Sequence, residues 1–209
     1  MTERFPRTAT NIIAALTALA WLAAFLFGQD KAAYALGFIP LRLTTSVGGF
    51  TAAPAFLTPL TATLVHSGLV HLGFNLLILV WCGAQVERVL GATGLVILYL
   101  VGAYAAAGAQ WGVDPMGATP VIGASGAISA VMGAFALSFG RARPFTNNLR
   151  VNRWLNVAWL MAAWIVLQMM MGWLAGGQGY LLATPAHVGG FAAGLLFQRP
   201  LLLWRYRSA

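Results

Sequence analysis

Long stretches without charged side chains are the feature that most constrains this chain of 209 residues. A helix needs about 20 mostly apolar residues to cross the hydrocarbon core of a bilayer. Hydrophobic residues make up 60% of the chain and charged residues only 8%, whereas soluble globular proteins carry about 25% charged residues. The sequence therefore predicts an all-α membrane protein and excludes a soluble domain. Six stretches qualify as transmembrane helices, at about 11–28, 67–86, 93–111, 123–140, 154–175 and 185–204.

The positions of the basic residues predict the orientation, because Lys and Arg accumulate in cytoplasmic loops. If both termini are cytoplasmic, ten of the twelve Lys and Arg residues lie on that side, and only Lys31 and Arg42 lie on the other. We expect a multi-pass protein of the cell membrane (inner or plasma membrane) with its N- and C-termini in the cytoplasm. The net charge of +8 does not indicate a nucleic-acid partner, because the basic residues are confined between apolar runs.

The segment from about 29 to 66 differs from the other connections. It is too apolar for a solvated loop, yet Pro40, Pro54 and Pro59 would interrupt any spanning helix. We therefore expect short, partly amphipathic helices that lie in the outer membrane interface between helices 1 and 2. The chain has no internal repeat and no soluble region, so residues 1–209 are expected to form a single membrane domain.

Polar side chains inside predicted membrane helices are costly and therefore indicate function. Asn75 follows His71 by four residues, so both lie on one helix face. Ser125 and His187 lie near the starts of the fourth and sixth predicted helices. These two helices run in the same direction and rise about 1.5 Å per residue, which places Ser125 and His187 at a similar depth. A serine that touches a neutral imidazole in a poorly hydrated site is an activated nucleophile.

Glycines on the fourth and sixth predicted helices indicate that the two backbones approach closely. They are Gly126, Gly133, Gly190 and Gly194. Each signal also has a purely structural explanation, since serines in membrane helices bond back to their own backbone and glycine faces serve packing. No His-Glu-x-x-His spacing and no nearby carboxylate support a metal site. We expect no metal and no cofactor.

Three segments together resemble the rhomboid intramembrane serine proteases. They are His66-Ser-Gly-Leu-Val-His71-Leu-Gly-Phe-Asn75, Gly123-Ala-Ser125-Gly126 and Ala186-His187-Val-Gly-Gly190-Phe-Ala-Ala-Gly194. The segment Glu87-Arg88-Val-Leu-Gly91 is also similar to the part of that family that follows helix two. The resemblance covers about residues 10–205 and implies a rhomboid-like bundle of six helices.

This resemblance implies a serine endopeptidase that cuts transmembrane segments of single-span proteins near the outer face of the bilayer through a covalent acyl-enzyme. It makes Ser125 the nucleophile and His187 the general base. The other matches surround the oxyanion hole: His71 and Asn75 as donors, Gly123 as the glycine that admits the oxyanion, and His66 as a support.

Two departures from the family pattern stand out. The family often has a tyrosine four residues after the nucleophile, where this chain has Ser129. We expect the Ser129 hydroxyl, one turn along the same face, to hydrogen-bond and orient His187 instead. The outer-loop Trp-Arg pair of the family is replaced by Leu57-Thr58. No carboxylate completes a triad, because the four acidic residues fall in termini or loops, so the expected site is a Ser–His dyad.

The expected partners are transmembrane protein substrates and membrane lipids, and the sequence leaves the oligomeric state open. The alternative function is a non-catalytic, rhomboid-like membrane chaperone or transport factor, and a lipid hydrolase or acyltransferase would also use a Ser–His pair. The fifth predicted helix, with Trp159, Trp164 and Trp173, is either a lateral gate or a set of bulky lipid-facing residues.

Overall fold

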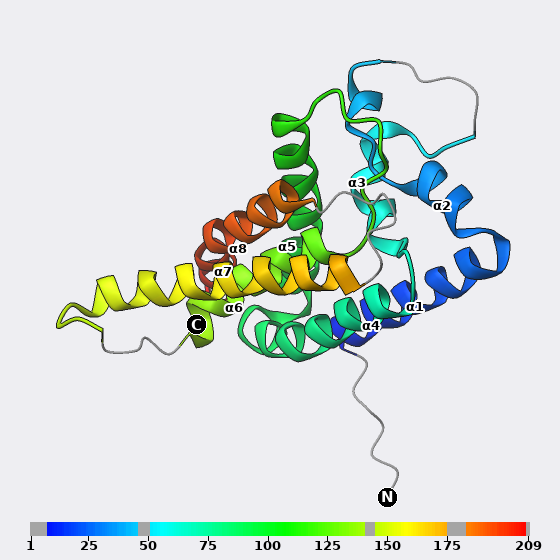
Figure 1. Cartoon of the computed structure of the whole chain (residues 1–209). Coiled ribbons are helices and arrows are strands. Elements are labelled where there is room, and N and C mark those ends of the chain that lie inside the picture. The colour runs from blue at the N-terminus through cyan, green and yellow to red at the C-terminus, as the bar shows by residue number, and fades with distance from the viewer. Residues whose placement is uncertain (1–7, 46–50, 141–144, 175–182, 208–209) are drawn as a thin grey trace, which may run out of the picture.

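The computed structural model describes residues 8–45, 51–140, 145–174 and 183–207. These residues are mostly helical, and the one strand-like pairing among them is an isolated antiparallel bridge between Phe38 and Val121. A helix lies in each of the six predicted apolar stretches (Figure 1). The long helices are α1 (Ala9–Phe27), α4 (Leu69–Ile78), α5 (Ala84–Val113), α6 (Ser125–Phe139), α7 (Leu149–Leu174) and α8 (Thr184–Arg205).

The second and third predicted helices form one helical run that folds back at a glycine. Helix α4 continues through a π-helical turn, η4 (Leu79–Gly83), into α5. Gly91 breaks the run with φ 78° and ψ 166°, a left-handed φ that residues with a Cβ rarely adopt. The chain therefore turns there, and the parts before and after Gly91 correspond to the predicted stretches 67–86 and 93–111.

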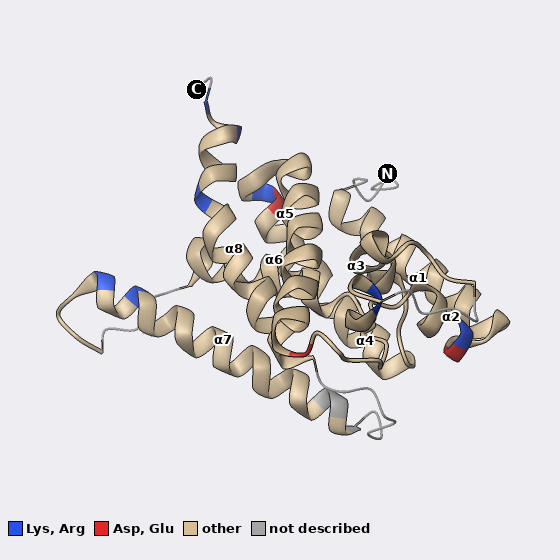
Figure 2. Ribbon diagram, turned by 90° about the horizontal axis from the view of Figure 1, so that it is seen from above, with Lys and Arg blue, Asp and Glu red and all other residues tan. Residues whose placement is uncertain are grey.

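Two helical runs are long and apolar enough to cross a membrane by length and hydropathy, namely Ala9–Phe27 and the whole run Leu69–Val113. Ser125–Phe139 is apolar but shorter, at 15 residues. The number of transmembrane passes therefore stays a prediction, although the helices lie where the sequence placed them. Charged residues lie near helix ends and in loops (Figure 2).

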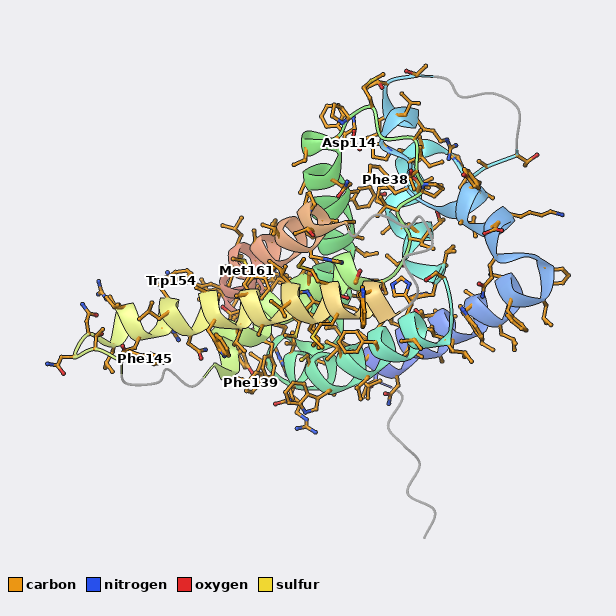
Figure 3. All side chains as sticks on the ribbon, viewed as in Figure 1. Phe38, Asp114, Phe139, Phe145, Trp154 and Met161 are labelled. Carbon is orange, nitrogen blue, oxygen red and sulfur yellow. The ribbon has the colours of Figure 1, made fainter. Side chains whose placement is uncertain are left out.

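The segment between α1 and α4 contains short helices, as the prolines predicted. Pro40 and Pro59 lie in the first turns of η1 and α3, where a missing backbone N–H costs nothing. Phe38 packs beside Ala107 near the end of α5 at Asp114 (Figure 3). The elements are α2 (Gln29–Leu36), η1 (Pro40–Leu43), η2 (Ala55–Leu57), α3 (Thr58–Thr61) and η3 (Ala62–Leu64).

Helix α6 is the centre of the bundle, with α5 and α8 beside it (Figure 2). A Cβ at Gly190 would collide with the carbonyl oxygen of Gly126, and one at Gly194 would collide with that of Ala130. A Cβ at Gly133 would collide with the carbonyl oxygen of Phe191 in the same way. The predicted close approach of the two helices is therefore confirmed, since their backbones touch. The missing side chain of Gly126 itself makes room for Ala106 of α5.

The end of the bundle that contains Gly91 is held by polar contacts. The Glu87 carboxylate accepts hydrogen bonds from the backbone N–H groups of Ala9 and Thr10, at 2.8 and 3.0 Å, and from the Thr10 hydroxyl at 2.6 Å. A carboxylate at this position satisfies the free N–H groups and the dipole of α1. The Arg205 guanidinium at the end of α8 donates to the Arg88 carbonyl at 2.6 Å. Three helices are thus joined near the turn at Gly91.

Candidate active site

Ser125 and His187 lie in contact although 62 positions separate them. The Ser125 Oγ and His187 Nε2 atoms are 2.9 Å apart, and the two residues are only 7% and 6% exposed. Ser125 is the first residue of α6, and His187 lies in the first turn of α8 after Pro185. The two side chains meet because the helices run in the same direction and their glycines bring the backbones together.

His187 can accept the serine proton only if its ring hydrogen is on Nδ1. In that tautomer, the unprotonated Nε2 accepts the hydrogen bond from the Ser125 hydroxyl. Nδ1 is buried and has no hydrogen-bond partner among the described residues. No group in the described part of the chain therefore orients the imidazole through that atom.

Ser129 does not form the hydrogen bond to His187 that the sequence predicted. Its hydroxyl donates to the Ser125 carbonyl at 2.7 Å, and the same oxygen accepts the indole N–H of Trp164 at 2.8 Å. A serine hydroxyl in a helix readily bonds the carbonyl four residues back, and this geometry directs its oxygen toward α7. Ser129 thus links the Ser125 backbone to α7 instead of orienting His187.

His71 lies against Gly123, two residues before Ser125. A Cβ on Gly123 would be 2.7 Å from His71 Nε2, and Gly123 has φ 112°, so both space and backbone conformation require glycine. The backbone N–H of Ser67 donates to His71 Nδ1 at a long 3.4 Å. Because a backbone N–H can only donate, this contact places the hydrogen of the neutral ring on Nε2. His71 therefore presents an N–H donor next to Gly123.

Asn75 is fully buried one turn after His71 on α4. Its Nδ2 donates to the His71 carbonyl at 2.8 Å, and its Oδ1 has no partner among the described residues. One amide hydrogen is thus used within α4. The second hydrogen on Nδ2 is the one that remains for an oxyanion.

His66 supports the backbone that leads into α6. Its Nε2 accepts the Ala124 backbone N–H at 3.3 Å, and the Gly123 N–H donates to the Ala62 carbonyl at 2.9 Å. His66 lies between η3 and α4, outside the predicted spans. Burial, with a smaller contribution from the nearby His71, lowers the pKa of His66 to about 3. The imidazole is therefore neutral at pH 7 and can accept the Ala124 N–H.

Two contributors to the site were not assigned a role by the sequence. Ser67 fixes the tautomer of His71, and only its position four residues before that histidine hinted at a contact. Trp164 is 2% exposed, whereas Trp159 and Trp173 on the same helix are 60% and 80% exposed. The sequence alone does not distinguish the three tryptophans, because their burial depends on the rotation of α7.

No cluster of three or more His, Cys, Asp or Glu side chains that could hold a metal ion occurs among the described residues. The one cysteine, Cys82, is fully buried and lies 3.2 Å from the Met132 sulfur. Its position is explained by packing.

Comparison with known proteins agrees with this geometry. The sequence profile of the rhomboid domain matches residues 54–204, which is more than half of the chain. Over 146 residues the chain is 31% identical to the rhomboid protease GlpG of Yersinia pseudotuberculosis, covering 69% of this chain and 46% of that protein. It is 30% identical over 136 residues to the rhomboid-type serine protease 2 of Emericella nidulans, covering 63% and 24%. It is 28% identical over 145 residues to the RHOMBOID-like protein 4 of Arabidopsis thaliana, covering 69% and 34%.

The chain therefore belongs to the rhomboid family, a family of membrane proteins that includes serine proteases. The matched region spans less than half the length of each of these relatives. The family assignment agrees with the resemblance seen in the three sequence segments.

Proposed function

We propose that this chain is an intramembrane serine endopeptidase that cuts transmembrane segments near the outer face of the bilayer. The observation that carries the proposal is the contact of 2.9 Å between Ser125 Oγ and His187 Nε2. In this proposal residues 1–209 form one membrane domain with six transmembrane helices in the cell membrane. Both termini are cytoplasmic, so the dyad lies toward the opposite, outer side.

The proposed reaction begins with proton transfer within the dyad. His187 Nε2 removes the Ser125 hydroxyl proton while the oxygen attacks the scissile carbonyl carbon. The carbon–nitrogen bond then breaks, His187 gives the proton to the leaving amine, and an acyl-enzyme remains on Ser125. A water molecule, deprotonated by His187, hydrolyses this ester and restores the serine. The dyad works without a carboxylate in this scheme.

Three donors are available for the negative oxygen of the tetrahedral intermediate. Ser125 begins α6, so its backbone N–H has no acceptor within the helix and lies at the positive end of the dipole. The His71 Nε2–H and the free hydrogen of Asn75 Nδ2 come from α4. Removing one such donor costs about 3–4 kcal/mol of transition-state stabilisation in other hydrolases.

The substrate must reach this buried dyad from lipid and in extended form. A helix engages its own carbonyls, so a transmembrane segment has to unwind locally before Ser125 can attack. We propose that α7 moves aside to admit it, because α7 is joined to α6 near the site through a side-chain contact, Trp164 to Ser129. Helix-weakening residues near the cut should favour cleavage, and water should enter from the outer side.

The deciding experiment is cleavage of a single-span substrate in liposomes by the purified protein. We expect Ser125→Ala and His187→Ala each to abolish cleavage without impairing insertion or purification. Ser138→Ala, which changes a serine at the inner end of the same helix, is the control and should cleave normally. A fluorophosphonate probe should label wild type on Ser125 alone. A protein that inserts correctly but neither cleaves substrates nor reacts with the probe would favour the non-catalytic chaperone or transport function.

A further inference from the structure

Gln168 is a buried amide on α7 that no function described so far uses. It is 5% exposed, and its Nε2 has no hydrogen-bond partner among the described residues. From residue 158 to residue 170, only Trp164 and Gln168 are buried, and they lie on one face of the helix, one turn apart. Buried amides are nearly always paired, so an unpaired one requires an explanation.

Contacts between α6 and α7 fix the depth of Gln168. The Asn156 side chain lies against Gly140, and the Trp164 indole N–H bonds the Ser129 hydroxyl. Moving toward the end of α7 therefore means moving toward the start of α6, so the two helices are antiparallel. Gln168 lies one turn beyond Trp164, and Ser125 lies one turn before Ser129. The amide is thus level with the serine of the dyad.

A second contact gives the same depth from α4. The Trp164 ring stacks on Phe74 with ring centroids 6.1 Å apart. His71 lies three residues before Phe74, one turn toward the outer end of α4. One turn outward from Trp164 therefore also leads to the level of His71. The end of α7 lies beside the starts of α4 and α6 in both ribbon views (Figures 1 and 2).

We propose that Gln168 is a substrate-binding residue whose side-chain amide donates a hydrogen bond to a backbone carbonyl of the extended segment bound over Ser125. The inference rests on the proposed protease function. A locally unwound substrate brings carbonyls that have lost their helical partners, and each needs a donor in a site poor in water. An unpaired buried N–H₂ at the depth of the nucleophile supplies one. Because the contact is to the backbone, it does not depend on the side chain before the scissile bond.

The test uses Gln168→Met, which keeps the length of the side chain and removes the donor. We expect kcat/KM for a single-span substrate in liposomes to fall about fivefold to tenfold, which corresponds to one hydrogen bond. The fall should be equal for substrates with Ala or Gly before the scissile bond. Labelling of Ser125 by a small fluorophosphonate should stay within about twofold of wild type. The melting temperature should be unchanged or higher, because an unpaired polar group is replaced by an apolar one.

Gln198→Met is the matched control, since Gln198 lies at the inner end of α8 and donates to Ser138. Its kcat/KM should equal that of wild type. An unchanged kcat/KM in Gln168→Met overturns the proposal. A parallel loss of probe labelling, or a lowered melting temperature, also overturns it by indicating a structural partner for the amide. A fall for one substrate only overturns backbone recognition. Wild type that neither cleaves nor labels refutes the proposed function itself, and this inference with it.

Discussion

Helix α8 packs against α6 backbone to backbone, whereas near the site α7 reaches α6 through side chains. Gly133, Gly190 and Gly194 leave no room for even one methyl group between α6 and α8. On the other side, Trp164 bridges to Ser129 with its indole N–H. The backbone contact between α6 and α8, called the rigid contact below, positions Ser125 and His187. The side-chain contact between α6 and α7, called the looser contact, borders the path that we propose for the substrate. Helix α6 therefore has one neighbour that is held tightly, α8, and one that can move more easily, α7.

The first half of α7 also packs more loosely than α8 does. It diverges from the bundle (Figure 2) and lies beside a cavity of about 420 Å³, open to the exterior. The cavity is lined by Phe145, Leu155, Asn156 and Trp159. Beside this open pocket, the first half of α7 has fewer protein contacts to break when it moves.

Gly190→Ala gives the largest expected effect, because it adds one methyl group to the rigid contact. The new Cβ would collide with the Gly126 carbonyl and force α8 away from α6. We expect the free energy of unfolding to fall by about 1–3 kcal/mol and cleavage to fall at least tenfold as His187 moves from Ser125. Thermal unfolding in detergent and the liposome cleavage assay measure the two effects.

Gly108→Ala is the control for that substitution. Gly108 lies on α5 with nothing within 4 Å of an added Cβ. This variant should keep full activity and equal or exceed the stability of wild type, because alanine is the better helix former. Equal losses in both variants would contradict the idea that backbone contact between α6 and α8 is special.

The pH dependence of stability tests the contact of His66 with the start of α6. The folded protein keeps His66 neutral, with a pKa of about 3, whereas the unfolded chain binds a proton near pH 6.5. The unfolded state therefore takes up the proton first as pH falls, and stability decreases between about pH 6.5 and pH 3. For this one group the loss between pH 7 and pH 5 is about 2 kcal/mol.

His66→Gln removes this titration while the glutamine oxygen still accepts the Ala124 N–H. Thermal unfolding in detergent at pH 7 and pH 5 should therefore show a smaller drop for the variant than for wild type. Equal drops would mean that His66 is protonated in the folded protein, and its role as acceptor for Ala124 would be refuted.

The smallest expected effect concerns the looser contact. Trp164→Phe removes the indole N–H and keeps a ring over Phe74, and Ser129→Ala removes the acceptor. A double-mutant cycle on unfolding should give a coupling of about 1 kcal/mol, as for one buried hydrogen bond. Because the bond holds α7 against α6, we expect Trp164→Phe to cleave substrate at least as fast as wild type. Two results would contradict the idea that α7 is held less tightly than α8. One is a coupling energy near zero between Trp164 and Ser129, and the other is a loss of activity in Trp164→Phe as large as in Gly190→Ala.

The sequence predicted the features that follow from periodicity and depth. Ser125 and His187 lie in the first turns of two helices that run in the same direction. Their contact could therefore be predicted from the rise per residue, which gives their depth, and from the small residues that let the helices approach. Prolines likewise predicted short helices between α1 and α4. These inferences need no knowledge of how any helix is rotated.

Features that depend on helix rotation and on side-chain rotamers could not be predicted from the sequence. Ser129 was expected to face His187, but its hydroxyl turned to its own helix and to Trp164. The bonds from Glu87 to the start of α1 join residues 77 and 78 positions apart, and no local pattern indicates such a partner. A side chain selects its partner only after the helices have packed, so these contacts are consequences of the fold.

The bonds of Glu87 and Arg205 have a consequence for the permeability of the membrane. They join α1, α5 and α8 at the end remote from Ser125. With that end held by these bonds, we expect motion within the bundle to be concentrated in the opposite half, which holds the proposed Ser125–His187 dyad. In the proposed protease, water would then reach Ser125 from one side without opening a path for protons or ions across the bilayer.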